Sequence, residues 1–232
     1  MNAVFIDRHD AGKKLARKLL EYADRTKTIV LGLPRGGVPV AYEIANKLHL
    51  PLDICLVRKL GTPGNPELAM GAVAESSLKE DDDGQITVLD RQQIQTKGYA
   101  GETIQAIAAR ETAELKWRES RYRHYRPMLT ISDRTVIVVD DGIATGMTMQ
   151  AAIQALKRHH PAKIIVATPV ASPQAIAQLT EIADEIVCLT TPRSLKAVGF
   201  WYRDFSQTSD REVCDLLSKQ DLEKFAEFCR LS

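Results

Sequence analysis

The sequence predicts an α/β protein with a doubly wound, mostly parallel sheet and helices on both of its faces. The first observation is that short apolar runs of strand length alternate with amphipathic segments of helix length, which is the pattern of βα units. The second is that the chain of 232 residues is 44% apolar and 26% charged. A chain of this length and composition can form a large core without disulfide or metal support.

Five apolar runs are expected to be buried strands: residues 28–33, 52–57, 135–139, 163–170 and 185–189. Four amphipathic segments are expected to be helices: residues 11–22, 38–48, 148–158 and the segment that begins at Ser172-Pro173. In residues 148–158, the apolar side chains recur at the i, i+3, i+4 and i+7 positions of one helical face. Ligands of such sheets bind beyond the carboxyl ends of the strands, so functional residues are expected there.

The remaining segments are less regular. Residues 68–74 and 86–89 are expected to be two further strands, and residues 60–66 a loop, because they hold two Gly and two Pro. We expect one domain over residues 1–232. A charged helical insertion would occupy about 84–126, and a C-terminal hood or tail with two short helices would occupy about 191–232.

The composition argues against several classes of protein. A formal net charge of +1 gives no overall field that would attract nucleic acid or a membrane. We see no apolar run of membrane-spanning length and no signal-like stretch in residues 1–10. The four cysteines lie far apart, without the spacing of a zinc site or a redox dithiol: Cys55, Cys188, Cys214 and Cys229. We therefore expect a reduced, cytoplasmic protein.

The strongest functional signal follows the strand expected at residues 135–139. That strand places Asp140 and Asp141 at its carboxyl end, and a loop then leads into a helix: Gly142-Ile143-Ala144-Thr145-Gly146-Met147-Thr148. Backbone N–H groups at a helix N-terminus attract anions, and the two threonine hydroxyls can donate to phosphate oxygens. Acids several residues before such a site suit a ligand with a diol at one end and a phosphate at the other, as in ribose 5-phosphate. The alternative is a plain strand–turn–helix connection in which Asp141 turns the chain and Thr145 or Thr148 caps the helix.

Residues 136–148 resemble the signature of the type I phosphoribosyltransferases: four apolar residues, two acids and a Thr-Gly-x-Thr loop. The whole chain resembles an uncharacterised family of predicted bacterial phosphoribosyltransferases. The resemblance implies the fold of that family and binding of phosphoribosyl pyrophosphate. It also implies a ribose-phosphate site made by seven residues: Asp140, Asp141, Ala144, Thr145, Gly146, Met147 and Thr148.

The resemblance also implies a pyrophosphate loop after the first strand, where this chain has Leu33-Pro34-Arg35-Gly36-Gly37. Arg35 offers a fork of donors, and the two glycines offer bare N–H groups. A cis peptide bond is expected at Arg35–Gly36. Arg58 and Lys59 would contact pyrophosphate as well. Residues 61–66 would form a mobile cover, with a solvated surface loop as the alternative, and Glu67 is more typical of a helix cap than of a magnesium ligand.

The aromatic segment after the last strand resembles the base site of purine phosphoribosyltransferases. Phe200 or Trp201 would stack on the base, and Asp204 would pair with a ring nitrogen or amine; the alternative is that these aromatics are core contacts. Arg8 is expected in the hood over the base. For the basic segment 116–126 we favour a solvated helix face over a subunit contact, a hood or a nucleic-acid site.

The function that the resemblance implies is transfer of the 5-phosphoribosyl group to a nitrogen of a purine-like base, with release of pyrophosphate. Mg²⁺ would be held at Asp140 and Asp141, with Arg35 and Lys59 assisting catalysis, and the protein would be a homodimer. One departure concerns Ala144, since enzymes for 6-oxopurines usually carry an Asp acid/base at this position. The alternatives are a non-catalytic sensor of phosphoribosyl pyrophosphate or a nucleotide, and a sugar-phosphate hydrolase, for which the sequence offers no general base.

Overall fold

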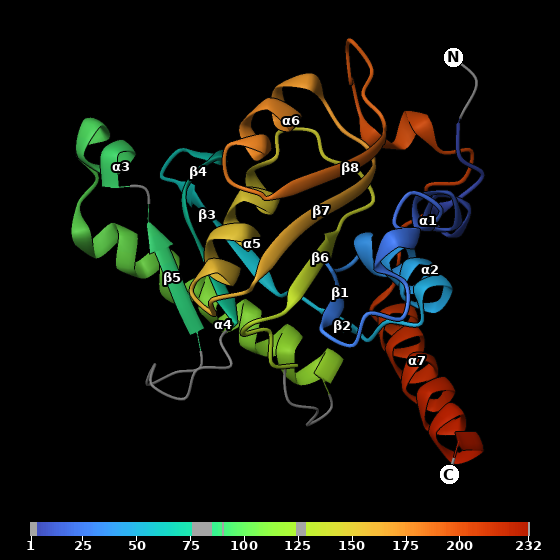
Figure 1. Cartoon of the computed structure of the whole chain (residues 1–232). Coiled ribbons are helices and arrows are strands. Elements are labelled where there is room, and N and C mark those ends of the chain that lie inside the picture. Colours follow the sequence, from blue (N-terminus) through green and yellow to red (C-terminus); the bar gives the residue numbers. More distant parts are fainter. Residues whose placement is uncertain (1–3, 76–84, 90, 124–128, 232) are drawn as a thin grey trace.

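The computed structural model describes residues 4–75, 85–89, 91–123 and 129–231, and Figure 1 shows the chain. Its centre is a five-stranded parallel sheet in the order β2-β1-β6-β7-β8. The strands are β1 (Thr28–Gly32), β2 (Leu52–Ile54), β6 (Thr135–Val139), β7 (Lys163–Val170) and β8 (Glu185–Thr190). The strand order reverses between β1 and β6, so the loops that follow these two strands flank the expected ligand site.

Helices cover both faces of the sheet, which confirms the predicted fold class (Figure 1). Val30 of β1 packs with α1 (Arg8–Ala16), α2 (Gly37–Leu48) and α7 (Asp210–Leu231) in one core. Its neighbour Ile29 packs with α5 (Met147–Lys157) and α6 (Pro173–Thr180) in the other. This alternation follows from the period of two in a strand, and it explains why these strands are apolar throughout.

A second, antiparallel sheet lies beside the first and consists of β3 (Val57–Thr62), β4 (Asn65–Glu75) and β5 (Gln85–Leu89). The prediction of a loop at residues 60–66 is wrong, because this segment is a hairpin with Pro63 and Gly64 at its turn. Gly64 has φ +78°, a conformation that suits glycine in tight turns. The strand expected at residues 52–57 is also corrected: it ends at Ile54, and Val57 begins β3.

The expected helical insertion contains α3 (Arg91–Lys97) and α4 (Gly101–Arg123), separated at Gly98 with φ +66°. The solvated-face interpretation of residues 116–126 is wrong for Tyr122 and Arg123, which are 2% and 5% exposed; residues 124–126 lie outside the described residues. Arg123 donates to Asp53 of β2 at 2.8 Å and to Glu75 of β4 at 2.9 Å. This buried network fixes the end of α4 against both sheets.

Other helix boundaries were predicted less well. The helix expected at residues 11–22 is α1 followed by a short 3₁₀ turn, η1 (Leu20–Tyr22). The two short helices expected in the tail are a 3₁₀ turn, η2 (Val198–Trp201), and the long α7. Ser172 caps α6 as predicted, accepting from the Ala175 N–H at 3.0 Å. Within the described residues, none of the helices is long and apolar enough to cross a membrane.

Candidate functional site

Two loops meet at the carboxyl edge of the sheet. Leu33, after β1, donates its N–H to the carbonyl of Val139 at the end of β6 at 2.9 Å. A Cβ atom at Gly37 would lie 2.5 Å from the same carbonyl oxygen, and one at Gly36 would lie 2.6 Å from Cγ of Asp141. Neither glycine therefore has room for a side chain. The structure brings together the two loops that the sequence pointed to, in direct contact.

Asp140 and Asp141 form a half-buried acid pair at this junction. The N–H of Asp141 donates to Oδ1 of Asp140 at 2.9 Å. Burial, and then the charge of Asp141, raise the pKa of Asp140 well above its usual value. Burial also raises the pKa of Asp141, although Arg8 opposes this shift. The pair therefore gains from a ligand that supplies hydroxyl donors or a cation.

Arg8 is the cation next to the acid pair. Its Nε lies 2.7 Å from Oδ2 of Asp141, and its Nη1 donates to the carbonyl of Ser206 at 2.7 Å. Its guanidinium lies 3.9 Å from the centre of the Phe205 ring. Tyr202 donates its hydroxyl to the backbone carbonyl of Asp141 at 2.5 Å. Arg8 was expected in the hood, but its bond to Asp141 and the contacts of Tyr202 and Phe205 were not predicted from the sequence.

The loop predicted to bind phosphate, residues 142–148, leads into α5 through Gly146, which has φ +78°. The helix begins at Met147 with no side-chain cap, which argues against the alternative in which Thr145 or Thr148 caps it. Both threonines are exposed, and the carbonyl of Ala144 accepts from the Ser172 hydroxyl at 2.7 Å. The open N-terminus of α5 therefore offers N–H groups and hydroxyls to an anion.

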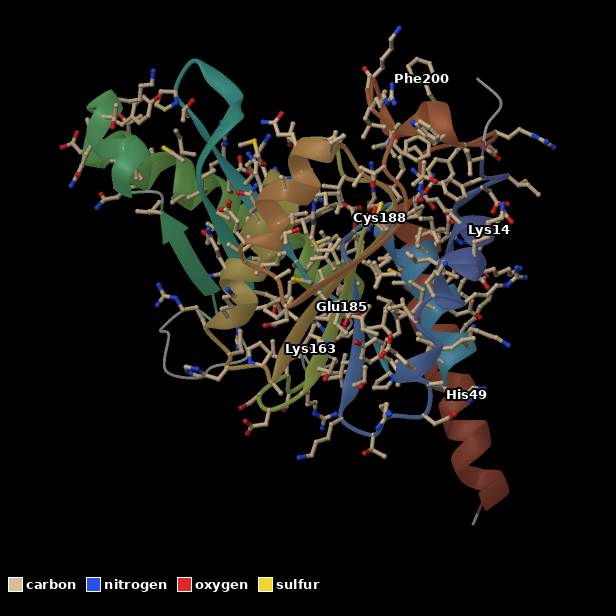
Figure 2. All side chains as sticks on the ribbon, turned by 45° about the horizontal axis from the view of Figure 1, so that its top comes forward. Lys14, His49, Lys163, Glu185, Cys188 and Phe200 are labelled. Carbon is tan, nitrogen blue, oxygen red and sulfur yellow. The ribbon has the colours of Figure 1, made fainter. Side chains whose placement is uncertain are left out.

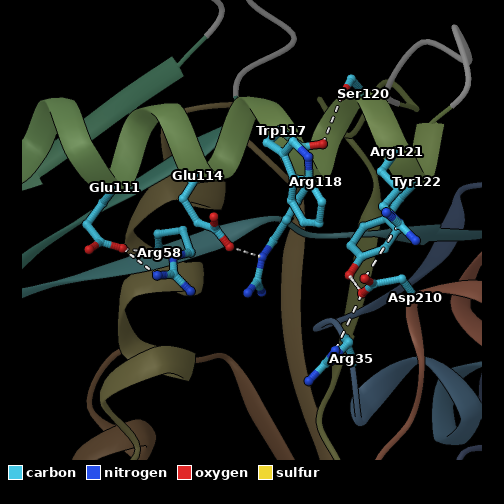
Figure 3. A network of polar contacts seen from close by, with 10 residues as sticks. All are labelled: Arg35, Arg58, Glu111, Glu114, Trp117, Arg118, Ser120, Arg121, Tyr122 and Asp210. Atoms are coloured by element: carbon cyan, nitrogen blue, oxygen red, sulfur yellow. Dashed lines mark hydrogen bonds and ion pairs between the residues drawn. The ribbon is translucent and has the colours of Figure 1, made fainter.

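The loop after β1 differs in detail from expectation. The cis peptide bond is Pro34–Arg35, one position before the expected Arg35–Gly36 bond. Gly37 is not a bare donor, since its N–H bonds to the carbonyl of Leu33 at 3.0 Å. The side chain of Arg35 lies with its Nη1 3.6 Å from Oδ1 of Asp210 in α7 (Figure 3).

A cavity of about 490 Å³ opens between this loop, the β3–β4 hairpin and α4. It is lined by residues of both signs of charge together with small hairpin residues: Pro34, Val57, Arg58, Lys59, Gly61, Thr62, Pro63, Gly64, Ile107, Arg110, Glu111, Arg118 and Thr148. The predicted pyrophosphate contacts Arg58 and Lys59 both face this cavity. They do so from within β3, which brings the hairpin to the edge of the parallel sheet.

α4 forms one wall of the cavity with three charged side chains, those of Arg110, Glu111 and Arg118. Figure 3 shows Glu111 and Arg118 on this helix. Glu111 accepts from Nη2 of Arg58 at 2.6 Å and from Nη2 of Arg110 at 2.9 Å. Desolvation raises the pKa of Glu111, but these bonds outweigh it and hold the pKa below its usual value. Arg118 pairs with Glu114 at 2.9 Å. Among all the residues that line the cavity, the cations Arg58, Lys59, Arg110 and Arg118 outnumber the single acid, Glu111, which favours an anionic ligand.

The predicted base-binding residues lie on the hood that joins the N-terminal segment to residues 198–206. Phe200 is 66% exposed, and Figure 2 shows it projecting from this hood. Trp201 is half-buried, and its carbonyl accepts from the Phe5 N–H at 3.0 Å. Asp204 is exposed and accepts from the Ser206 N–H at 2.9 Å. An added Cβ at Gly142 would lie 2.7 Å from Cγ2 of Val198, so the hood packs directly on the acid loop.

The family model described as "Phosphoribosyl transferase domain" matches residues 6–201. The chain belongs to this phosphoribosyl transferase family. Two curated Mycobacterium tuberculosis proteins, each named a "Putative phosphoribosyl transferase", are 41% identical to it over 216 residues. The match covers 93% of this chain and 47% of each relative, so the chain spans about half the length of the curated relatives it matches.

A solved structure of similar length, TT1426 from Thermus thermophilus, is 41% identical, with a TM-score of 0.80. The similarity covers 93% of this chain and 98% of that one. These findings confirm the resemblance inferred from residues 136–148.

Proposed function

We propose that this protein transfers a 5-phosphoribosyl group from phosphoribosyl pyrophosphate to a nitrogen of a purine-like base and releases pyrophosphate. The observation that carries the proposal is the direct contact between the Gly36–Gly37 loop and the Asp140–Asp141 pair. A sugar held by its hydroxyls at the acids would have its C1 substituent beside the glycine loop. Its 5-phosphate would then lie at the N-terminus of α5.

Each part of the ligand has a proposed set of contacts. The 5-phosphate is bound by the loop from Ala144 to Thr148, including the N–H groups of Gly146 and Met147. The ribose hydroxyls donate to Asp140 and Asp141. The diphosphate is bound by the loop of Arg35, Gly36 and Gly37 and by Arg58 and Lys59 across the cavity. The base lies under the hood, with Phe200 or Trp201 stacking on it and Asp204 pairing with its edge.

The acid pair fits Mg²⁺ bound together with the substrate. Among the described residues, no three His, Cys, Asp or Glu side chains gather as a preformed metal site. Mg²⁺ commonly binds one or two carboxylates and completes its shell with substrate phosphates and water. Asp140 is the better of the two ligands, because Asp141 already pairs with Arg8 at 2.7 Å. The ion, when bound, would neutralise charge on the leaving diphosphate.

The reaction breaks the bond between C1 of the ribose and an oxygen of the diphosphate, which leaves with the bonding electrons. The acceptor nitrogen forms the new bond to C1 and gives up its proton to the released diphosphate or to water. Positive charge develops on the sugar in this process, so orientation and electrostatic stabilisation supply most of the catalysis. The half-buried Asp140 and Asp141 stabilise that charge. Ala144 provides no acid/base group, which argues against 6-oxopurines handled in the usual way.

The test is to incubate the protein with phosphoribosyl pyrophosphate, Mg²⁺ and a panel of bases and to measure pyrophosphate release. We expect release with at least one purine-like base, and loss of that activity in the Asp140→Asn, Asp141→Asn double variant. Asp24→Asn is the matched control, because Asp24 is exposed and precedes β1 at the opposite end of the sheet. Full activity in the double variant would contradict the site assignment.

The second candidate is a non-catalytic sensor of phosphoribosyl pyrophosphate. Two observations favour it: Ala144 offers no proton donor, and Arg58 is already engaged by Glu111. Tight binding of the sugar diphosphate without pyrophosphate release across the panel would support the sensor and contradict the transferase.

A further inference from the structure

Asp210 joins three parts of the chain that are far apart in sequence. Its Oδ1 accepts from the hydroxyl of Tyr122 in α4 at 2.6 Å and lies 3.6 Å from Nη1 of Arg35. Its Oδ2 lies 3.5 Å from Nε of Arg121. Figure 3 shows the three partners converging on this one carboxylate. Asp210 thus connects α4 and α7 to the loop that follows β1.

The helix that carries the carboxylate is capped and anchored in the core. Asp210 is the first residue of α7, and Ser209 caps that helix by accepting from the Glu212 N–H at 3.1 Å. An acid at this position is favoured by the helix dipole. The next turns of α7 are anchored in the core by Val213 and Leu217, which are 0% and 2% exposed. Tyr122, its hydrogen-bond donor, is itself buried.

The surroundings of Asp210 also favour its ionised form. The hydrogen bond from Tyr122, followed by the nearby Arg121 and Arg35, holds the pKa of Asp210 below its usual value against the effect of desolvation. The side chain of Arg35 is therefore drawn towards α7, whereas Pro34, its neighbour, lines the cavity. Within this loop, Pro34 therefore faces the cavity and the Arg35 guanidinium faces α7.

We propose that Asp210 is a positioning residue for the diphosphate: it holds Arg35, and through Arg35 it fixes the backbone of the Pro34–Gly37 loop. This inference rests on the proposed function, since that function assigns the loop to the diphosphate. Loss of the Asp210 charge frees the Arg35 side chain and lets the loop adopt other conformations. The diphosphate must then order the loop as it binds, which lowers its affinity.

The test compares two ligands that differ only in the diphosphate. Calorimetry is used, with Mg²⁺ present throughout, to measure the affinity of the protein for phosphoribosyl pyrophosphate and for ribose 5-phosphate. Asp210→Asn is expected to weaken the first about tenfold, or about 1.4 kcal/mol, and to leave the second unchanged. Tyr122→Phe is expected to act in the same direction with a smaller effect. Asp215→Asn, one turn further along α7 and exposed, is the matched control and should change neither affinity.

A double-mutant cycle that combines Asp210→Asn with Arg35→Ala tests whether Asp210 acts through Arg35. If Asp210 acts through Arg35, Asp210→Asn has no further effect once Arg35 is replaced. Equal weakening of both ligands would show a merely structural role and overturn the proposal, as would an unchanged affinity. A rise in diphosphate affinity would mean that Asp210 competes for Arg35, and would overturn it too. If the unchanged protein binds neither ligand, the proposed function itself fails, and the inference fails with it.

Discussion

Replacing Gly36 with alanine tests the contact between the two loops most directly. The added Cβ would lie 2.6 Å from Cγ of Asp141, closer still to Oδ2, and 3.2 Å from Nε of Arg8. Ordinary van der Waals contact begins at 3.4 Å, so the carboxyl group must retreat by roughly 1 Å, a displacement large enough to disturb a catalytic geometry. It cannot do so freely, because Arg8 holds Oδ2 at 2.7 Å and Tyr202 holds the carbonyl of the same residue.

A misplacement of about 1 Å in a positioning group can cost about 100-fold in rate. We therefore expect Gly36→Ala to lower kcat/KM for phosphoribosyl pyrophosphate by about 100-fold, measured as pyrophosphate release. Gly101→Ala is the control, because a Cβ there meets nothing within 4 Å. It should retain full activity. If Gly36→Ala keeps kcat/KM within a factor of two of the unchanged protein, the close contact between Gly36 and the Asp141 carboxyl group does not matter for catalysis, and the reasoning is refuted.

Three further predictions concern stability, followed by thermal or chemical denaturation. Because burial and the charge of Asp141 raise the pKa of Asp140, this side chain progressively destabilises the fold as pH rises from its unfolded pKa towards its folded pKa. Asp140→Asn should therefore stabilise the protein at pH about 8, on the order of 1 kcal/mol, and an equal gain at acid pH would contradict this. The hydrogen bond to Glu43 raises the pKa of His9, so its stabilisation is present below the unfolded value and lost as pH rises through the folded one. Since His9 is partly exposed, Glu43→Gln should remove only a few tenths of a kcal/mol of that pH dependence, and identical profiles for the two proteins would argue against the interaction. Arg123→Ala leaves two buried acids unpaired and should cost about 3–5 kcal/mol; a loss below about 1 kcal/mol would show that the network contributes little.

Sequence reasoning predicted the parts of the candidate site whose residues are close together in the chain. Residues 136–148 hold a strand, two acids, a loop and a helix start in one continuous run, so spacing alone placed them correctly relative to one another. The five strands of the parallel sheet were found for a similar reason, since burial on both faces makes each of them an uninterrupted apolar run.

The parts that were missed depend on partners far along the chain. The pairing of β3 with β4 turns a segment rich in Gly and Pro into a hairpin, although its composition is typical of a loop. Arg123 looked like part of a solvated basic face until Asp53 and Glu75, 70 and 48 residues away, were brought to it by the fold. Asp210 carries no local signal at all, because its role comes from three side chains on other elements.

The bond between Arg8 and Asp141 has a consequence for how the protein folds. It joins residues 133 positions apart, and Tyr202 reaches the same acid from 61 positions away. Closing contacts between such distant positions costs chain entropy, whereas the contacts within residues 140–148 are local, so we expect the long-range contacts to form later. A partly folded chain would therefore possess the phosphate loop, which is local, before it possesses a neutralised acid pair under a hood. A ligand that needs both ends of the site would recognise the completed fold alone, and its binding would stabilise that fold against unfolding.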